Sequence, residues 1–184
     1  MMPAAAGRLF IAFNDCVLKE RLSSRLCSAY GRWLGGFRTL ELRSAGKRGG
    51  FEVEALGGEK ALFASRELVS PVSFNKYALD LGALERTALP ALEAAAAAGK
   101  ILYFDELGPM AMKSERFSAR CVELLFSGAP CLVFFRRGAA VFEEAFRKME
   151  GSLSVELSEE GWAEAVRDSE AWLDAKACMM RNDE

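Results

Sequence analysis

Apolar positions in this chain fall into segments of different period, and the first two segments predict a strand followed by a helix. Residues 9–13 are all apolar, which is typical of a buried strand. Leu22, Leu26 and Tyr30 then recur at a spacing of four residues, so we expect an amphipathic helix over 18–32. This part of the sequence therefore predicts a strand, a short loop and a helix.

The next section has a different period. Short strand-like runs at 37–42, 51–56 and 61–63 are separated by glycine-rich segments. They predict antiparallel hairpins over about 36–66, inserted between the first helix and the rest of the chain. Such an insertion is unusual for a simple doubly wound sheet.

The remainder of the chain alternates between apolar strands and amphipathic helices. Together with the first unit, this alternation predicts an α/β fold with a mainly parallel sheet flanked by helices and an inserted antiparallel β-hairpin region. The expected elements are helix 81–98, bent or restarted at Pro90; strand 100–104; helix 114–127, capped by Ser114; strand 131–135; helix 140–149; strand 153–157; and helix 159–174, capped by Ser158.

Length and composition limit the class of protein. A chain of 184 residues suits one domain, so residues 1–184 are assigned to one domain, with those after 174 expected to be loose. With 24 basic and 26 acidic residues, the net charge is −2, and neither nucleic acid nor membrane is expected as a partner. The N-terminal apolar run is too short to span a bilayer, and the five cysteines show no C-x-x-C spacing, so we expect reduced thiols and a cytoplasmic location. Histidine is absent, so catalysis would have to use carboxylates and lysine.

The segment 13–20 has the outline of a phosphate-binding loop without its glycines. A P-loop reads G-x-x-x-x-G-K-[ST] after a buried strand, because backbone amides must curl around phosphate oxygens and only glycine permits that approach. Only Lys19 matches the four defining positions, since Phe13 and Leu18 replace the glycines and Glu20 replaces the hydroxyl residue. The candidate phosphate-loop residues are Asn14, Asp15, Cys16, Val17, Leu18, Lys19 and Glu20.

A second motif lies at 101–108, where an apolar run ends in two acids, Asp105 and Glu106. This is a Walker B pattern, in which the aspartate holds Mg²⁺ and the following glutamate polarises the attacking water. By itself the segment is more simply a buried strand that ends in polar residues. Combined with Lys19, it has the order in which a P-loop fold brings both motifs to one edge of a parallel sheet. Asp105 and Glu106 are therefore the catalytic candidates, and Asp105 and Glu20 the candidate Mg²⁺ ligands.

Further segments complete a resemblance that covers nearly the whole chain. The positions that carry it are Lys19; Gly36, Phe37 and Thr39; Gly46, Arg48, Gly50 and Phe51; Lys76 and Tyr77; residues 88–92; and residues 105–110. In their ordered combination they are similar to the P-loop nucleoside-triphosphatase family of the cancer-related nucleoside triphosphatase type. The resemblance implies a P-loop α/β fold and, in active relatives, slow Mg²⁺-dependent hydrolysis of nucleoside triphosphates with broad base tolerance.

The chain departs from this family at the positions that touch phosphate. Phe13, Cys16 and Leu18 are expected to occupy space that phosphate oxygens need. Asp15 and Glu20 add negative charge, and a like-charge contact near 4 Å costs about 4 kcal/mol at an effective dielectric of 20. The hydroxyl that completes Mg²⁺ coordination is missing as well, so the chain is expected to bind a triphosphate weakly.

Two functions remain open. The leading hypothesis is a weak or non-hydrolytic homologue that needs no cofactor and acts by binding or association. The alternative is an active enzyme that converts ATP or GTP to the diphosphate and phosphate, with Mg²⁺ and the nucleotide as cofactors. Lys19 either contacts phosphate or forms an internal ion pair with Asp105, Asp15 or Glu20, and burial of an ammonium group favours the ion pair. A nucleotide is a candidate ligand, and a protein partner or a homo-oligomer stays open.

Other side chains also have two interpretations. Arg136 and Arg137 could serve as phosphate cations, but adjacent arginines after a strand more often lie in a solvated loop. Trp162 and Trp172 are expected in the core or at an interface. The aromatic residues in or beside apolar runs are expected in the core: Phe104, Phe117, Phe126, Phe134 and Phe135.

Overall fold

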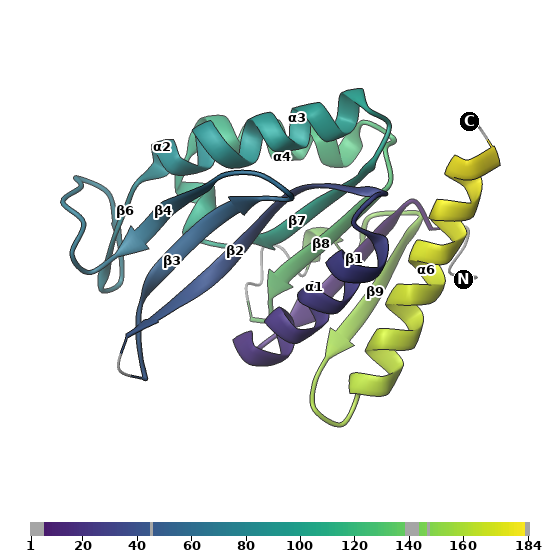
Figure 1. Cartoon of the computed structure of the whole chain (residues 1–184), viewed down its shortest axis with the longest axis horizontal. Coiled ribbons are helices and arrows are strands. Elements are labelled where there is room, and N and C mark those ends of the chain that lie inside the picture. Colours follow the sequence, from purple (N-terminus) through teal and green to yellow (C-terminus); the bar gives the residue numbers. More distant parts are fainter. Residues whose placement is uncertain (1–5, 45, 139–143, 147, 183–184) are drawn as a thin grey trace.

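Nine strands form a single sheet in the computed structural model, which describes residues 6–44, 46–138, 144–146 and 148–182 (Figure 1). The strands lie in the order β5-β6-β4-β3-β2-β7-β8-β1-β9. Their bounds are β1 (Arg8–Phe13), β2 (Leu34–Ser44), β3 (Lys47–Ala55), β4 (Lys60–Ser65), β5 (Ser73–Phe74), β6 (Tyr77–Leu79), β7 (Ile101–Leu107), β8 (Cys131–Arg136) and β9 (Ser152–Leu157).

The sheet has a parallel half and an antiparallel half that meet at β2. Strands β2, β7, β8, β1 and β9 run parallel to one another, whereas β3, β4, β6 and β5 continue the sheet with antiparallel pairings. The predicted α/β fold with antiparallel hairpins is confirmed. The hairpins extend the same sheet, and the antiparallel strands make up almost half of it. Gly36 permits the junction, because it has a φ of +139° and a Cβ there would collide with the carbonyl oxygen of Tyr103 on β7.

Helices cover both faces of the sheet (Figure 1). One face carries α3 and α4 and the other carries α1 and α6, so the molecule has three layers. None of the helices in the described ranges is long and apolar enough to cross a membrane. The helical bounds are α1 (Cys16–Tyr30), α2 (Leu81–Ala83), the π-helical turn η2 (Leu84–Ala88), α3 (Leu89–Ala97), the 3₁₀ turn η3 (Ala111–Lys113), α4 (Glu115–Phe126) and α6 (Trp162–Asn182).

The central strands are apolar along their length because both of their faces are covered. In β8, Leu132 and Phe134 pack toward α1 and α6, while Val133 and Phe135 pack toward α3 and α4. The same alternation in β1 and β7 produces two cores, one on each face. The parallel half therefore forms a rigid base whose carboxyl ends can position side chains.

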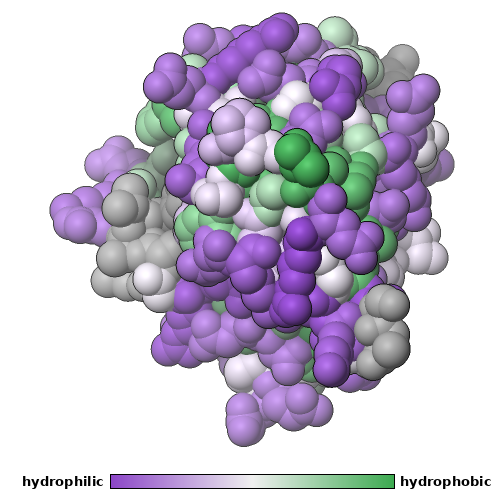
Figure 2. Space-filling view, turned by 90° about the vertical axis from the view of Figure 1, so that its left-hand side faces the viewer, coloured by the Kyte–Doolittle hydropathy of each residue, from purple (hydrophilic) through white to green (hydrophobic). Residues whose placement is uncertain are grey.

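The antiparallel end of the sheet presents a different surface. Figure 2 faces this end and shows apolar side chains gathered in the middle of it, surrounded by hydrophilic ones. Leu62 on β4 and Val69, which follows β4, are exposed apolar residues of this part of the chain. Apolar surface therefore reaches solvent where the sheet is not covered by α1 and α6.

Two helices differ from their predicted form. The helix around Pro90 is continuous from Leu81 to Ala97, and a π turn precedes the proline, in which the amide of Leu89 donates to the carbonyl of Leu84. Pro90 then lies in the first turn of α3, where its missing amide hydrogen costs nothing. The last helix continues to Asn182 instead of ending at 174, with Ala177 buried against the protein.

The core predictions are correct except at one aromatic residue. Phe104, Phe117, Phe134 and Phe135 are buried, but Phe126 is 65% exposed. It lies on the outward side of α4 beside the guanidinium group of Arg8, which is 5.9 Å from the ring centroid.

The C-terminal tryptophans differ in burial. Trp172 is fully buried and donates its indole hydrogen to the carbonyl oxygen of Ala6 at 2.9 Å, so it belongs to the core. Trp162 is partly buried and stacks against Arg21 of α1. Of the helix predicted over 140–149, residues 140–143 and 147 lie outside the described residues.

Candidate functional site

The turn between β1 and α1 is closed by a carboxylate. Asp15 is the N-cap of α1, and its Oδ1 accepts hydrogen bonds from the amides of Val17 at 2.6 Å and Leu18 at 3.2 Å. Free amides at a helix N-terminus attract anions, since they carry the positive end of the helix dipole. In this chain an internal anion already accepts from two of them.

The bulky residues of this turn do not point where the sequence suggested. Phe13 and Leu18 are buried in the core between the sheet, α1 and α6, so they do not fill the space above the turn. That expectation is wrong for both, because an apolar side chain gains more by entering the core than by lining a polar site. Cys16 is the partly buried member of the three and remains at the site. The outward positions Asn14, Asp15, Val17 and Glu20 are exposed.

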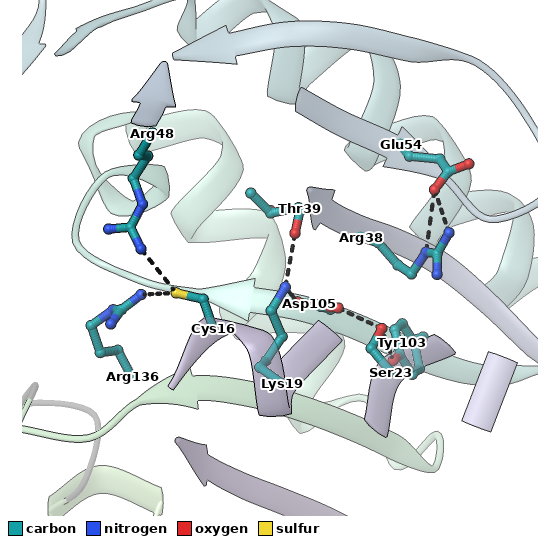
Figure 3. A network of polar contacts seen from close by, with 10 residues as sticks. All are labelled: Cys16, Lys19, Ser23, Arg38, Thr39, Arg48, Glu54, Tyr103, Asp105 and Arg136. Carbon is teal, nitrogen blue, oxygen red and sulfur yellow. Dashed lines mark hydrogen bonds and ion pairs between the residues drawn. The ribbon is translucent and has the colours of Figure 1, made fainter. Parts of the chain in front are cut away.

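Lys19 and Asp105 form a buried ion pair (Figure 3). Lys19 lies on α1, which follows β1, and Asp105 lies on β7, which β8 separates from β1 in the sheet. The Lys19 Nζ lies 2.7 Å from the Asp105 Oδ1 and also donates to the carbonyl oxygen of Thr39 at 2.8 Å. Burial alone would lower the pKa of Lys19, but the charge of Asp105, helped by that of Glu106, raises this pKa above its ordinary value. The internal partner of Lys19 is therefore Asp105, and not Asp15 or Glu20.

Two residues that the sequence analysis did not single out complete this network. Ser23 donates from its Oγ to the Asp105 Oδ2 at 2.7 Å, and the hydroxyl of Tyr103 donates to the Ser23 Oγ at 2.8 Å (Figure 3). Ser23 lies one helical turn after Lys19, so the two side chains leave the same face of α1. Both carboxylate oxygens of Asp105 are thus engaged within the protein.

Glu106 lies next to Asp105 in sequence but contacts a different part of the molecule. Its half-buried side chain lines a cavity beside β3, and it forms no hydrogen bond or ion pair with the part of the chain that the structure describes. Burial raises the pKa of Glu106 above its usual range, and the charges of Lys19 and Arg136 oppose this rise without cancelling it. Glu106 is therefore an acid at the edge of the site that has no direct hydrogen-bond or ion-pair partner among the described residues.

Arg136 belongs to the site, whereas its neighbour Arg137 does not. At the end of β8, the Arg136 guanidinium donates to the Cys16 Sγ at 3.0 Å and to the carbonyl oxygen of Asn14 at 3.3 Å (Figure 3). Arg48 approaches the same sulfur from β3 at 3.7 Å. Arg137 instead pairs with Glu156 at 3.5 Å and is half exposed. The two arginines thus separate into a site residue and a surface residue.

The candidate Mg²⁺ ligands differ in burial and in partners. The two oxygens of Asp105 accept from Lys19 and Ser23, and Glu20 is exposed on α1. No group of three or more acidic or cysteine side chains within the described ranges could hold a metal ion. The candidate ligands Asp105 and Glu20 are therefore not combined into a cation site.

A cavity of about 290 Å³ adjoins the ion pair. It is linked to the pair through Thr39, whose carbonyl accepts from Lys19 and which also lines the cavity. The volume is near the lower limit of the range for small-molecule sites. The carboxyl ends of β7 and β8 contribute Glu106 and Arg136, so the cavity lies where open α/β sheets usually bind ligands.

A parallel half-sheet whose first helix directs a lysine onto the aspartate of β7, one strand removed from β1, agrees with a P-loop type of α/β protein. Residues 10–168 match the family model described as NTPase, and the chain belongs to this family. The resemblance inferred from the sequence is thereby confirmed.

Several relatives carry the name of a nucleoside-triphosphatase. Nucleoside-triphosphatase THEP1 of Thermococcus kodakarensis is 34% identical over 139 residues, which cover 72% of this chain and 77% of the relative. The protein of that name from Thermotoga petrophila is 30% identical over 125 residues, covering 68% and 70% of the two chains.

Two solved structures share the fold. The crystal structure of THEP1 from Aquifex aeolicus matches with a TM-score of 0.79 at 23% identity, and covers 88% of this chain and 96% of that one. The solution structure of a human cancer-related nucleoside triphosphatase matches with a TM-score of 0.65 at 25% identity, covering 88% and 95%.

Proposed function

We propose that this member of the NTPase family does not hydrolyse nucleoside triphosphates and acts by binding or association. The observation that carries the proposal is the buried pair of Lys19 and Asp105, in which the lysine is neutralised and both carboxylate oxygens are used. A triphosphate would have to draw Lys19 away and leave a buried carboxylate without its cation. Such a loss typically costs about 3–5 kcal/mol.

The Asp15 cap supports the same proposal. A phosphate group near the start of α1 would compete with the carboxylate for the amides of Val17 and Leu18. It would also be repelled by that carboxylate, at about 4 kcal/mol for charges 4 Å apart at an effective dielectric of 20. Both penalties act at the start of α1, where the backbone amides of a P-loop would attract phosphate.

The proposal is tested by phosphate release and thermal melting with ATP and GTP in the presence of Mg²⁺. We expect phosphate release no faster than the uncatalysed background and no rise in melting temperature with either nucleotide. A rise in melting temperature that is lost in Lys19→Ala would contradict the proposal. Lys148→Ala, which removes an exposed lysine that pairs with Glu144, is the matched control.

A second candidate function is an active triphosphatase, and the unpaired carboxylate of Glu106 favours it. A free glutamate one residue after the Walker B aspartate has the chemistry to polarise an attacking water. This alternative predicts that Glu106→Gln abolishes phosphate release while the protein stays folded. Equal release from the wild type and this variant would assign the activity to a contaminant.

A further inference from the structure

The cavity beside the ion pair has a preformed apolar wall. Phe51 on β3 and Phe63 on β4 are buried, and both line it together with Phe74 and Met110. Phe51 is held in place by an edge-to-face contact with Tyr77, with ring centroids 5.5 Å apart. Such a wall suits the apolar body of a small ligand, since little side-chain freedom is lost on binding.

The same cavity has an acid on its wall, Glu106, that has no direct hydrogen-bond or ion-pair partner among the described residues. The carboxylate of Glu106 accepts no hydrogen bond and meets no cation at ion-pair distance within the described parts of the chain. A half-buried carboxylate of this kind is stabilised by a hydrogen-bond donor that carries positive charge. The ligand is therefore expected to bring a cationic group to Glu106.

A cation lines the cavity as well. Arg136 is held by two acceptors that are not carboxylates, the Cys16 Sγ at 3.0 Å and the carbonyl oxygen of Asn14 at 3.3 Å. It makes no ion pair with any residue of the described ranges, in contrast to Arg48, which pairs with Glu41. Its guanidinium group is thus oriented in advance without a carboxylate of the described residues at ion-pair distance, and a carboxylate of the ligand would supply one.

We propose that this cavity binds a small zwitterion with an apolar body, of the class of amino acids with large apolar side chains. The ligand's ammonium group lies at Glu106, its carboxylate at Arg136, and its side chain against Phe51, Phe63 and Phe74. A neutral apolar ligand would desolvate both protein charges without giving either one a direct ion-pair partner, and a purely anionic one would be repelled by Glu106. The zwitterion compensates both charges at once.

This inference does not rest on the proposed lack of hydrolysis. Binding is measured without nucleotide or Mg²⁺, so its failure and a failure of the proposed function give different readouts.

The experiment measures dissociation constants by calorimetry. The first probes are L-phenylalanine, L-leucine, L-methionine and L-tryptophan. The best of the four is then compared with two analogues of the same side chain, one lacking the amino group and one lacking the carboxylate. We expect each analogue to bind roughly tenfold to a hundredfold more weakly, because each loses one charge-assisted interaction. Absence of binding by all four amino acids at millimolar concentration, or equal binding of the analogues, would overturn the proposal.

Two variants test which protein residue binds the amino group of the ligand and which binds its carboxylate. Glu106→Gln should remove the preference for the probe over its analogue without the amino group. Arg136→Gln should remove the preference over the analogue without the carboxylate. Arg137→Gln, next in sequence but paired with Glu156 outside the cavity, should leave both preferences unchanged. Melting curves show whether each variant is folded, and a folded Glu106→Gln protein that keeps both preferences would contradict the proposal.

Discussion

Lys19 and Asp105 are joined by a 2.7 Å contact between Nζ and Oδ1, and their side chains are only 5% and 1% exposed. The two residues come from different layers, a helix and the sheet beneath it. Their pair therefore ties α1 to the parallel half of the sheet while it neutralises the two charges that a triphosphatase would use.

Lys19→Met should be strongly destabilising. It leaves the Asp105 carboxylate buried without its cation, so we expect a loss of about 3–5 kcal/mol in the free energy of unfolding. Denaturant titration measures the loss. Arg167→Met, which breaks an exposed pair with Glu164, is the control and should change stability by less than about 1 kcal/mol. A cost for Lys19→Met as small as that of the control would show that the pair is not buried in solution.

Asp15→Ala should weaken the start of α1. The variant removes the acceptor for the amides of Val17 and Leu18, and loss of an N-cap costs about 0.5–2 kcal/mol. Asp15→Ser restores an acceptor without the charge and should recover most of the loss. Thermal unfolding compares the three proteins, and an Asp15→Ala variant as stable as the wild type would contradict the capping role.

Ser23 and Tyr103 should be energetically coupled. Ser23→Ala deprives Asp105 of a donor and the Tyr103 hydroxyl of its acceptor, so we expect a cost of about 1–3 kcal/mol. In the background of Tyr103→Phe the same substitution should cost less, because the hydroxyl that it would leave unpaired is already gone. A double-mutant cycle by denaturant unfolding measures the coupling, and strictly additive costs would rule the contact out.

Glu106→Gln should stabilise the protein near neutral pH. Burial raises the pKa of Glu106 in the folded state, so the stability associated with its protonated form is complete below the ordinary value of 4.5 and is lost as the pH rises through the folded pKa. The amide stays uncharged throughout. The melting temperature of the variant should therefore exceed that of the wild type at about pH 8 and converge with it at about pH 4.

The exposed Glu20→Gln variant reports any general effect of removing a negative charge. If the difference in melting temperature between Glu106→Gln and the wild type is the same at about pH 4 and about pH 8, the Glu106 carboxylate is not destabilised by burial.

Local patterns were sufficient to predict most of the fold. The apolar runs of β1, β7 and β8 are uninterrupted because both of their faces are covered, and this is visible in the sequence. The course of the helix through Pro90 was not visible in the sequence, because a π turn at Leu84–Ala88 depends on how the helix meets the sheet. Phe126 was assigned to the core from its apolar neighbours, although its place on α4 turns it outward.

The site was predictable in outline and not in its contacts. The order of the two motifs indicated that Lys19 and Asp105 would approach each other, since both follow or end parallel strands. The roles of Ser23 and Tyr103 depend on side chains from separate elements meeting in the interior, and no local pattern encodes that distance. A spacing of four residues between Lys19 and Ser23 was the one signal that could have pointed to the serine.

The junction of the sheet at β2 has a consequence for how the chain acquires its structure. Strands β2 to β6 are consecutive in sequence and pair with near neighbours, so they can assemble from local segments alone. The parallel half must wait, because β1 is flanked by β8 and β9 from the far end of the chain. During synthesis the antiparallel strands β2 to β6 can thus emerge and pair first. The free edge of β2 is then available for pairing with β7, and the later strands follow.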